Sequence, residues 1–214
     1  MSLAPFISLD GIDGTGKSTQ CRLLVEWLQQ SGVPVLACAD PGGTPLGAQL
    51  REILLNSRAE MSPRAEALLF MASRAELVAK VILPALTAGI VVLSDRFVTA
   101  NVVYQGHAGG LNPAELWQLG SFSSDGVLPD LTMILDLPVE LAVTRRGRSA
   151  DRMEARGLAY LEQVRQGFLK EAAKQPTCFR VLDASPSVEE LQQQLRQEVR
   201  HLLRSRGFKV EADV

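Results

Sequence analysis

The sequence predicts a three-layer α/β fold, in which a mostly parallel sheet of five strands is flanked by helices on both faces. The apolar runs that indicate strands are continuous and do not alternate with polar residues. Such runs are typical of strands buried on both faces, as they are in a parallel sheet covered by helices. The first run is followed directly by a glycine-rich loop and then by a helical pattern, so strands and helices alternate along the chain.

The glycine-rich loop carries the most informative pattern. After the apolar run 6–9, residues 11–18 fit G-x-x-x-x-G-K-S, and residues 18–30 follow with helical periodicity. Glycines let the backbone N–H groups of such a loop surround phosphate oxygens, and the positive N-terminus of the next helix adds to the attraction. The lysine of the pattern contacts the β- and γ-phosphates, and the serine hydroxyl binds Mg²⁺. A glycine turn with a chance lysine is the alternative, but the flanking strand and helix favour a nucleotide-binding P-loop.

The rest of the chain supplies four further strands and a series of helices. Serine and proline at 62–63 and a capping box at 187–190 mark two helix starts, because serine caps a helix and proline is favoured at its first position. Predicted strands cover 33–37, 90–94, 130–137 and 179–182. Predicted helices cover 48–55, 62–89 with a kink near Pro84, 99–105, a segment capped by Asn112, 139–146, 155–174 and 187–205. Residues 1–214 therefore fit a single domain, with a short arginine-rich lid at about 146–154.

Composition limits the classes of function. Apolar residues make up 46% of the sequence and the formal net charge is −2, which fits a soluble globular protein and argues against a general binder of nucleic acids or membrane surfaces. The most apolar uncharged run, 81–94, is interrupted by Pro84 and Gly89 and is shorter than the roughly 18 residues of a membrane span. The three cysteines lack paired spacing and the N-terminus lacks a basic region, so we expect reduced thiols in a cytoplasmic protein.

Two charged residues follow the predicted strand 90–94. Asp95 and Arg96 lie at the edge where open α/β sheets bind ligands. A carboxylate at the end of a buried strand is costly unless it meets a cation or a metal. A structural ion pair is one interpretation. With a P-loop in the chain we favour the other, in which Asp95 binds Mg²⁺ through water or positions phosphates and Arg96 holds the transferring phosphate.

Five arginines gather in a short segment: Arg145, Arg146, Arg148, Arg152 and Arg156. An arginine-rich helix end is often only a solvated face. Gly147 and Ser149 interrupt this one, however, which favours a lid that closes over a triphosphate, excludes water and neutralises charge during phosphoryl transfer.

Taken together, these motifs resemble those of the thymidylate kinase family, P-loop nucleoside monophosphate kinases that convert dTMP to dTDP. The resemblance covers nearly the whole chain: D-G-x-D-G-x-G-K-S at 10–18, D-P-G-G-T at 40–44, L-L-F-x-A-S-R at 68–74, D-R-F at 95–97, Y-Q-G at 104–106, P-D-L-T at 129–132, D-R-x-E at 151–154 and D-A-S at 183–185. The P-loop is common to many families. The L-L-F-x-A-S-R, D-R-F and Y-Q-G segments in this order are specific.

The resemblance implies roles around the transferring phosphate. The residues expected to bind ATP form the loop and the start of its helix: Gly11, Asp13, Gly14, Thr15, Gly16, Lys17, Ser18 and Thr19. Those expected to take part in catalysis are Lys17, Asp95, Arg96 and, from the lid, Arg148 and Arg152. Mg²⁺, bound together with ATP, is expected at Ser18 and Asp95. Some relatives carry an arginine where this chain has Gly14, so the catalytic cation is expected from the lid.

It also implies roles on the acceptor side. The residues expected to bind dTMP are Asp13, Asp40, Arg51, Phe70, Arg74, Arg96, Asn101, Tyr104 and Gln105. Phe70 resembles the ring that stacks on thymine, Arg74 the guanidinium that bonds its O4, and Tyr104 the residue that crowds the 2′ position of the sugar. Asn101 and Gln105 correspond to polar groups at the base edge. Asp13 resembles the carboxylate near the 3′-hydroxyl, while Arg51 and Arg96 resemble the clamp on the acceptor phosphate.

We therefore expect an ATP:dTMP phosphotransferase of dTTP biosynthesis that acts as a cytoplasmic homodimer without nucleic-acid or membrane partners. One alternative is a GTP-binding switch, because residues 40–43 fit D-x-x-G, but the sequence has no N-K-x-D segment to read guanine. The other alternative is a kinase that acts on an unphosphorylated deoxynucleoside. The excess of arginines on the acceptor side argues against it.

Overall fold

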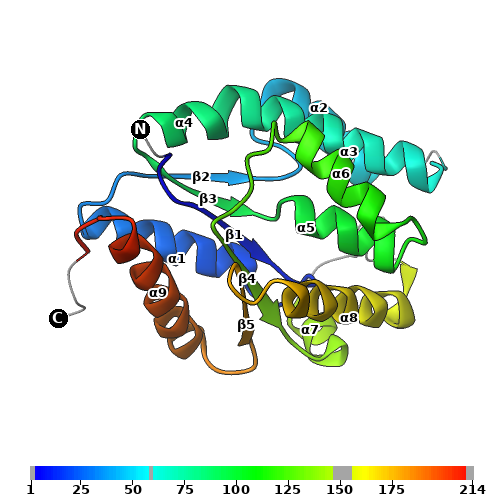
Figure 1. Ribbon diagram of the computed structural model, residues 1–214. Helices are drawn as coiled ribbons and strands as arrows, with labels where there is room; N and C mark the ends of the chain where they lie inside the picture. Colours follow the sequence, from blue (N-terminus) through cyan, green and yellow to red (C-terminus); the bar gives the residue numbers. More distant parts are fainter. Residues whose placement is uncertain (1–2, 58–59, 147–155, 211–214) are drawn as a thin grey trace.

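The computed structural model describes residues 3–57, 60–146 and 156–210. Its centre is a five-stranded sheet with the order β2-β3-β1-β4-β5, in which every neighbouring pair is parallel (Figure 1). The strands are β1 (Phe6–Asp10), β2 (Val35–Ala39), β3 (Val91–Asp95), β4 (Leu131–Asp136) and β5 (Phe179–Asp183). The predicted α/β architecture is confirmed, and the sheet is parallel throughout the described residues rather than mostly parallel.

Helices cover both faces of the sheet, and each face has its own hydrophobic core (Figure 1). In β1, Ile7 and Leu9 belong to the core that includes residues of α1, α8 and α9, whereas Phe6 belongs to the core that includes α3, α4 and α6. This division follows from the two-residue period of a strand, which sends successive side chains to opposite faces. Apolar side chains are therefore needed on both sides of the strand, which explains the continuous apolar run.

The helical elements have the following bounds: α1 (Lys17–Gln30), α2 (Pro45–Asn56), α3 (Pro63–Leu77), η1 (Val78–Ile82), α4 (Leu83–Thr87), α5 (Val98–Asn101), η2 (Val102–His107), α6 (Pro113–Ser123), α7 (Val139–Arg146), α8 (Leu158–Lys174) and α9 (Val188–Ser205). The two predicted serine caps are confirmed. The Ser62 side chain accepts from the backbone N–H of Ala65, and Ser187 and Glu190 form the capping box of α9. Among the described residues, no helix is long and apolar enough to cross a membrane.

Two predicted boundaries near the N-terminus were wrong by a few residues. Strand β2 begins at Val35 rather than residue 33, because Pro34 has no N–H for the ladder and enters the sheet only through its carbonyl, which accepts from the Val91 N–H. Helix α2 begins at Pro45 rather than residue 48. The Thr44 side chain caps it by accepting from the backbone N–H of Gly47, so the helix starts as soon as this bond is available.

Two predicted helices also differ in their interior. The segment 62–89 is continuous, and it contains the π-helical turn η1, which ends two residues before Pro84. A π-helical turn accommodates the missing proline N–H without breaking the helix. The segment predicted as a helix over 99–105 is a short α-helix, α5, that continues as the π-helix η2 to His107. The predicted lid at about 146–154 lies, apart from Arg146 at its start, outside the described residues.

Candidate active site

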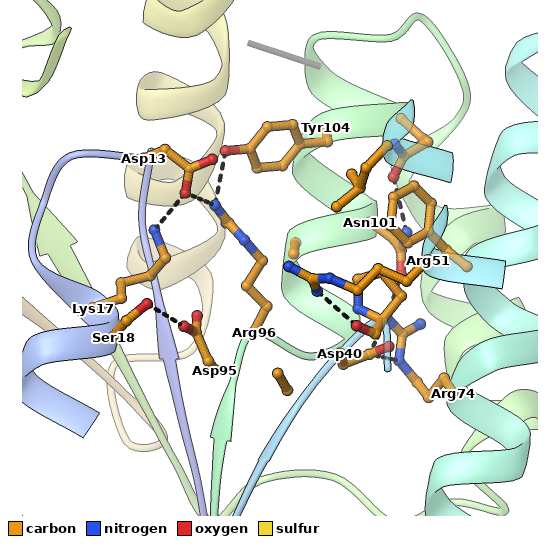
Figure 2. A pocket seen from close by; sticks show the side chains of 16 residues that line it. Asp13, Lys17, Ser18, Asp40, Arg51, Arg74, Asp95, Arg96, Asn101 and Tyr104 are labelled. Atoms are coloured by element: carbon orange, nitrogen blue, oxygen red, sulfur yellow. Dashed lines mark hydrogen bonds and ion pairs between the residues drawn. The ribbon is translucent and has the colours of Figure 1, made fainter. Parts of the chain in front are cut away.

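The site lies at the carboxyl edge of the sheet, where the neighbouring strands β2, β3 and β1 end level with one another. Leu9 of β1 and Ala39 of β2 are both paired with Asp95 of β3, so the segments that follow these strands meet in space. These segments are the glycine loop 11–16, the loop 40–44 and the D-R-F turn 95–97. Asp13 and Arg96, which are 83 positions apart in the sequence, therefore line one cavity (Figure 2).

The glycine loop is fixed by close packing and by its backbone angles. Gly14 has φ 92°, and a Cβ atom added to it would lie 2.0 Å from the carbonyl oxygen of Ala142 in α7. Gly16, also at φ 92°, is the cap of α1, and here an added Cβ would meet nothing within 4 Å. The Thr15 hydroxyl donates to the Ile12 carbonyl at 2.9 Å. The loop thus keeps its shape through its own residues and through contact with α7.

Lys17, Asp13 and Arg96 form a charged cluster next to this loop (Figure 2). The buried Lys17 ammonium donates to the carbonyls of Gly11 and Ile12 and to Asp13 Oδ1, at 3.1, 2.9 and 3.1 Å. Burial lowers the pKa of Lys17, and the nearby Arg96 guanidinium lowers it further. Asp13 opposes both effects. The cluster holds two cations beside one carboxylate, so it presents excess positive charge to an anionic ligand.

Arg96 reaches this cluster because of an unusual backbone conformation. Its φ is 69°, in the left-handed region that non-glycine residues rarely adopt, and the Ser94 hydroxyl donates to its carbonyl at 2.7 Å. From this position the guanidinium donates to the Gly11 carbonyl at 2.9 Å and to Asp13 Oδ1 at 2.7 Å. It also lies 5.1 Å from the centre of the Tyr104 ring, and burial raises the pKa of that phenol. The D-R-F turn therefore aims its arginine back at the glycine loop.

Ser18 and Asp95 lie together on the other side of Lys17 (Figure 2). The Ser18 hydroxyl donates to Asp95 Oδ2 at 3.0 Å. One hydroxyl and one carboxylate form a pair of hard oxygen ligands, the chemistry that Mg²⁺ prefers when phosphates and water complete its shell. The residues at this point therefore fit a magnesium ion.

A second group of side chains lines the cavity on the side of α3 and α5 (Figure 2). Arg74, only 1% exposed, places Nε and Nη2 each 2.6 Å from Oδ2 of the fully buried Asp40 carboxylate. Complete burial raises the pKa of Asp40, and the charge and hydrogen bond of Arg74 counteract this rise. The Arg51 guanidinium donates to the Pro41 carbonyl at 2.7 Å. Phe70, one turn before Arg74 on the same helix, supplies an apolar face to the same cavity.

Asp10 ends β1 directly below the glycine loop and is completely buried. Its Oδ2 accepts from the Ser8 hydroxyl at 3.2 Å, and among the described residues its Oδ1 has no hydrogen-bond partner. Burial raises the pKa of Asp10 to about 7, although the charges of Arg96 and Lys17 act in the opposite direction. The carboxyl is therefore partly protonated near neutral pH.

Comparison with known proteins identifies the family. Residues 9–195 match the family model described as thymidylate kinase. The chain belongs to the thymidylate kinase family. It is 50% identical over 185 residues to a thymidylate kinase of Rhodopirellula baltica, covering 86% of this chain and 76% of that protein. It is 45% identical over 203 residues to one of Symbiobacterium thermophilum, covering 94% and 95%, and 43% identical over 188 residues to one of Neisseria gonorrhoeae, covering 87% and 91%.

In this member of the thymidylate kinase family, the cavity collects most of the residues predicted from the sequence. It is lined by Asp13, Lys17, Ser18, Asp40, Arg51, Phe70, Arg74, Asp95, Arg96, Asn101, Tyr104 and Gln105. Five predicted residues, Gly11, Gly14, Thr15, Gly16 and Thr19, belong to the loop and the first turn of α1 and do not line it. Arg148 and Arg152 lie outside the described residues.

Several residues of this thymidylate kinase site escaped the sequence reasoning. Pro41, Leu55 and Ala100 also line the cavity, which small or apolar residue types alone do not signal. Two of the five clustered arginines contact other parts of the chain instead of the cavity. Arg145 donates to the carbonyls of Ala184 and Ser185, at 2.6 and 2.8 Å.

The second of these arginines is Arg156, which donates to Glu66 at 2.7 Å. Glu66 lies four residues before Phe70 and eight before Arg74 on α3. That helical spacing is the signal that would have placed Glu66 near the site.

Proposed function

We propose that this protein transfers the γ-phosphoryl group of ATP to the phosphate of dTMP and so forms dTDP. One observation carries the proposal. Lys17 and Ser18 at the end of the phosphate-binding glycine loop share one cavity with Phe70 and Arg74 of α3, and the Asp13–Arg96 pair lies between the two groups.

The chemistry of this reaction needs alignment and charge neutralisation more than acid–base catalysis. The attacking atom is a phosphate oxygen that is already largely anionic at neutral pH, so no strong general base is required. The P-loop N–H groups and Lys17 bind the phosphates of ATP, while Arg96 and Arg51 hold the acceptor phosphate in line. Ser18 and Asp95 would hold Mg²⁺, which would neutralise charge on the nucleotide. Arg148 and Arg152 complete the set of cations on our proposal.

The pocket on the α3 side suits thymine deoxynucleotides. Phe70 offers a ring for stacking, and Arg74, Asn101 and Gln105 offer polar groups at the base edge. Tyr104 narrows the space between this pocket and Arg96, to which its hydroxyl is hydrogen-bonded at 3.3 Å. We assign it the exclusion of a 2′-hydroxyl. We place the reaction in the cytoplasm, where ATP is abundant and where Cys21, Cys38 and Cys178, free in the structure, stay reduced.

A coupled assay for ADP release tests this function. The purified protein is incubated with ATP and Mg²⁺ and offered dTMP, thymidine, dUMP, dCMP or no acceptor. We expect turnover with dTMP that exceeds turnover with thymidine by several orders of magnitude, because thymidine lacks the phosphate that the arginines bind. Preference for thymidine would instead indicate a deoxynucleoside kinase. A parallel assay replaces ATP with GTP and omits the acceptor. Hydrolysis of GTP there, with none of ATP, would indicate a GTP-binding switch.

We also propose that the protein is a homodimer, joined through an apolar groove between α3, η1 and α6. Leu68, Leu119 and Phe122 line this groove and are 54%, 38% and 87% exposed. Helices α3 and α6 lie side by side (Figure 1). In a dimer with a twofold axis, this groove of one copy packs against the same groove of the other copy. Large apolar side chains gathered on one face usually mark an interface.

Analytical ultracentrifugation of the wild type and of Phe122→Asp tests the dimer. We expect the wild type to sediment as a dimer and Phe122→Asp to dissociate, because burying an unpaired carboxylate is costly. Val188→Asp is the matched control, since Val188 is 44% exposed in the first turn of α9 and away from the groove. A monomeric wild type, or dissociation by both variants alike, would contradict the proposed interface.

A further inference from the structure

A line of hydrogen bonds connects the base side of the cavity to a carboxylate outside it. Arg74 Nη2 donates to Asn101 Oδ1, and Figure 2 labels both residues. Asn101 Nδ2 donates to Gln105 Oε1 at 2.9 Å, and Gln105 Nε2 donates to Glu66 Oε1 at 2.9 Å. Arg74, Asn101 and Gln105 line the cavity, whereas Glu66, 2% exposed, does not.

A second guanidinium approaches Glu66 from the opposite side. Arg156 Nη2 donates to Glu66 Oε2 at 2.7 Å, and the Arg156 side chain remains 32% exposed. Tyr160 helps to hold Arg156 in place, because its hydroxyl accepts from Nη1 at 3.1 Å and its ring centre lies 5.0 Å from the guanidinium carbon. Glu66 therefore lies between a line of donors that starts at Arg74 and a donor from Arg156.

The chemistry of the two ends dictates the direction of every bond in this line. A guanidinium can only donate and a carboxylate can only accept. Arg74 therefore requires the oxygen of Asn101, which turns the amide nitrogen of Asn101 toward the oxygen of Gln105. Gln105 must in turn direct its nitrogen at an acceptor, and Glu66 is that acceptor. Each amide nitrogen keeps a second N–H that is not used in the line.

We propose that Glu66 is a positioning residue for base selectivity: it fixes which atoms the Asn101 and Gln105 amides present to the acceptor base, and Arg156 makes a carboxylate necessary at this point. The inference deepens the proposed function and rests on it. With both amides oriented, their free N–H groups favour a pyrimidine with an oxygen at position 4, such as thymine, over cytosine with its amino group. An amide that reverses exchanges a donor for an acceptor and weakens this preference.

The Glu66→Gln variant isolates the role of the carboxylate, because it keeps the shape of the side chain. Both ends of the line, Arg74 and Arg156, still donate, and three amides now lie between them. An amide that accepts through its oxygen presents its N–H to the next residue. With a guanidinium donor at each end of the line, at least one pair of neighbouring groups must therefore be two donors, N–H against N–H. Removing Arg156 takes away the donor of this mismatched link, and the oxygen of the introduced amide can then accept from Gln105.

The experiment compares the wild type, Glu66→Gln, Arg156→Ala and the double variant, with dTMP and dCMP as acceptors. One mismatched buried donor changes an equilibrium by about tenfold or more. We therefore expect Glu66→Gln to raise the KM for dTMP and to lower the dTMP-to-dCMP ratio of kcat/KM, each by about tenfold, with the KM for ATP within about twofold. Arg156→Ala and the double variant are expected within about threefold of the wild type.

Glu171→Gln is the matched control for the loss of a buried carboxylate. Glu171 is 1% exposed and accepts from His107 at 2.6 Å and Trp117 at 2.9 Å, but it does not line the cavity. We expect this variant to lower Tm and to leave the KM for dTMP and the dTMP-to-dCMP ratio unchanged. The control separates a general loss of stability from a specific effect on the base.

Three outcomes would overturn the inference. Wild-type KM and selectivity in Glu66→Gln would show that the carboxylate does not orient the amides. Failure of the double variant to recover selectivity would show that no directional conflict with Arg156 exists. If Glu66→Gln does not fold, the double variant is still expected to fold and to select dTMP, and its failure would have the same meaning. The proposed function is judged separately, by whether the wild type phosphorylates dTMP at all.

Discussion

The buried pair of Arg74 and Asp40 makes a strong prediction about stability as well as binding. Their side chains are 1% and 0% exposed, and two guanidinium nitrogens lie 2.6 Å from one carboxylate oxygen. Arg74→Ala leaves the Asp40 carboxylate buried without its cation. Removing one partner of such a pair typically costs about 3–5 kcal/mol.

The size of the effect follows from this cost. In a chain of this length, each kcal/mol lowers Tm by about 2–4 °C, so Arg74→Ala is expected to lower Tm by roughly 6–20 °C. Asp40→Ala leaves the buried Arg74 guanidinium without its anion, and the expected loss of unfolding free energy is similar. The double variant leaves no unpaired charge, so it is expected to be less destabilised than the two single variants added together, by about 2 kcal/mol or more.

Chemical unfolding of the four proteins measures these free energies, and steady-state kinetics measures the KM for dTMP. Because Arg74 also lines the cavity, we expect the KM for dTMP to rise in Arg74→Ala and to stay high in the double variant, although the double variant regains stability. Strict additivity of the two free-energy losses would refute the ion pair. Recovery of the KM together with the stability would refute a direct contact between Arg74 and the base.

Three further predictions concern the glycine loop and the strand below it. Lys17→Met is expected to lower kcat on the order of a hundredfold or more with little change in Tm, because it removes one preorganised charge and keeps the stem; kcat near the wild-type value would exclude its proposed role. The pKa of Asp10 is about 7 in the folded protein, against an ordinary value of 3.8. Between these pH values the unfolded chain loses the proton while the folded protein retains it, so the free energy of unfolding falls as pH rises. Urea titrations measure the free energy of unfolding of the wild type and of Asp10→Asn at pH 4 and pH 8. Relative to the wild type, this free energy is expected to rise in the variant by up to about 4 kcal/mol from pH 4 to pH 8. The same difference between the two proteins at both pH values would mean that Asp10 titrates normally. Gly14→Ala and Gly16→Ala share the same backbone strain, but only the first places a Cβ 2.0 Å from Ala142, so it is expected to lose about 1–3 kcal/mol more; equal losses would contradict the packing of the loop on α7.

Most of the fold was predictable because its signals are local. Continuous apolar runs indicate strands buried on both faces, and serine caps mark where helices begin. The convergence of Lys17, Asp40 and Arg96 was predictable as well, since parallel strands bring the segments after their carboxyl ends to one edge. Boundaries were less accurate where a backbone bond decided them, as at Pro34, whose carbonyl alone joins the sheet.

Contacts between distant segments were not predictable from local patterns. The ion pair of Arg156 with Glu66 joins residues 90 positions apart, and composition placed Arg156 with the other arginines of the segment 145–156. The π-helix η2 was not predicted because its sequence is compatible with an ordinary α-helix, from which a π-helix differs in its pattern of backbone hydrogen bonds. Such features depend on how elements pack, which a single sequence does not display.

The backbone of Arg96 separates what is best for stability from what is best for activity. At φ 69° a residue with a side chain costs about 1–2 kcal/mol relative to its ordinary conformation, whereas glycine adopts this angle freely. Only the strained arginine, however, directs a guanidinium at Asp13 and the Gly11 carbonyl. A library of this protein selected for heat resistance alone would therefore drift toward glycine at position 96 and lose turnover, while selection on both properties would retain the arginine and find its stabilising substitutions elsewhere.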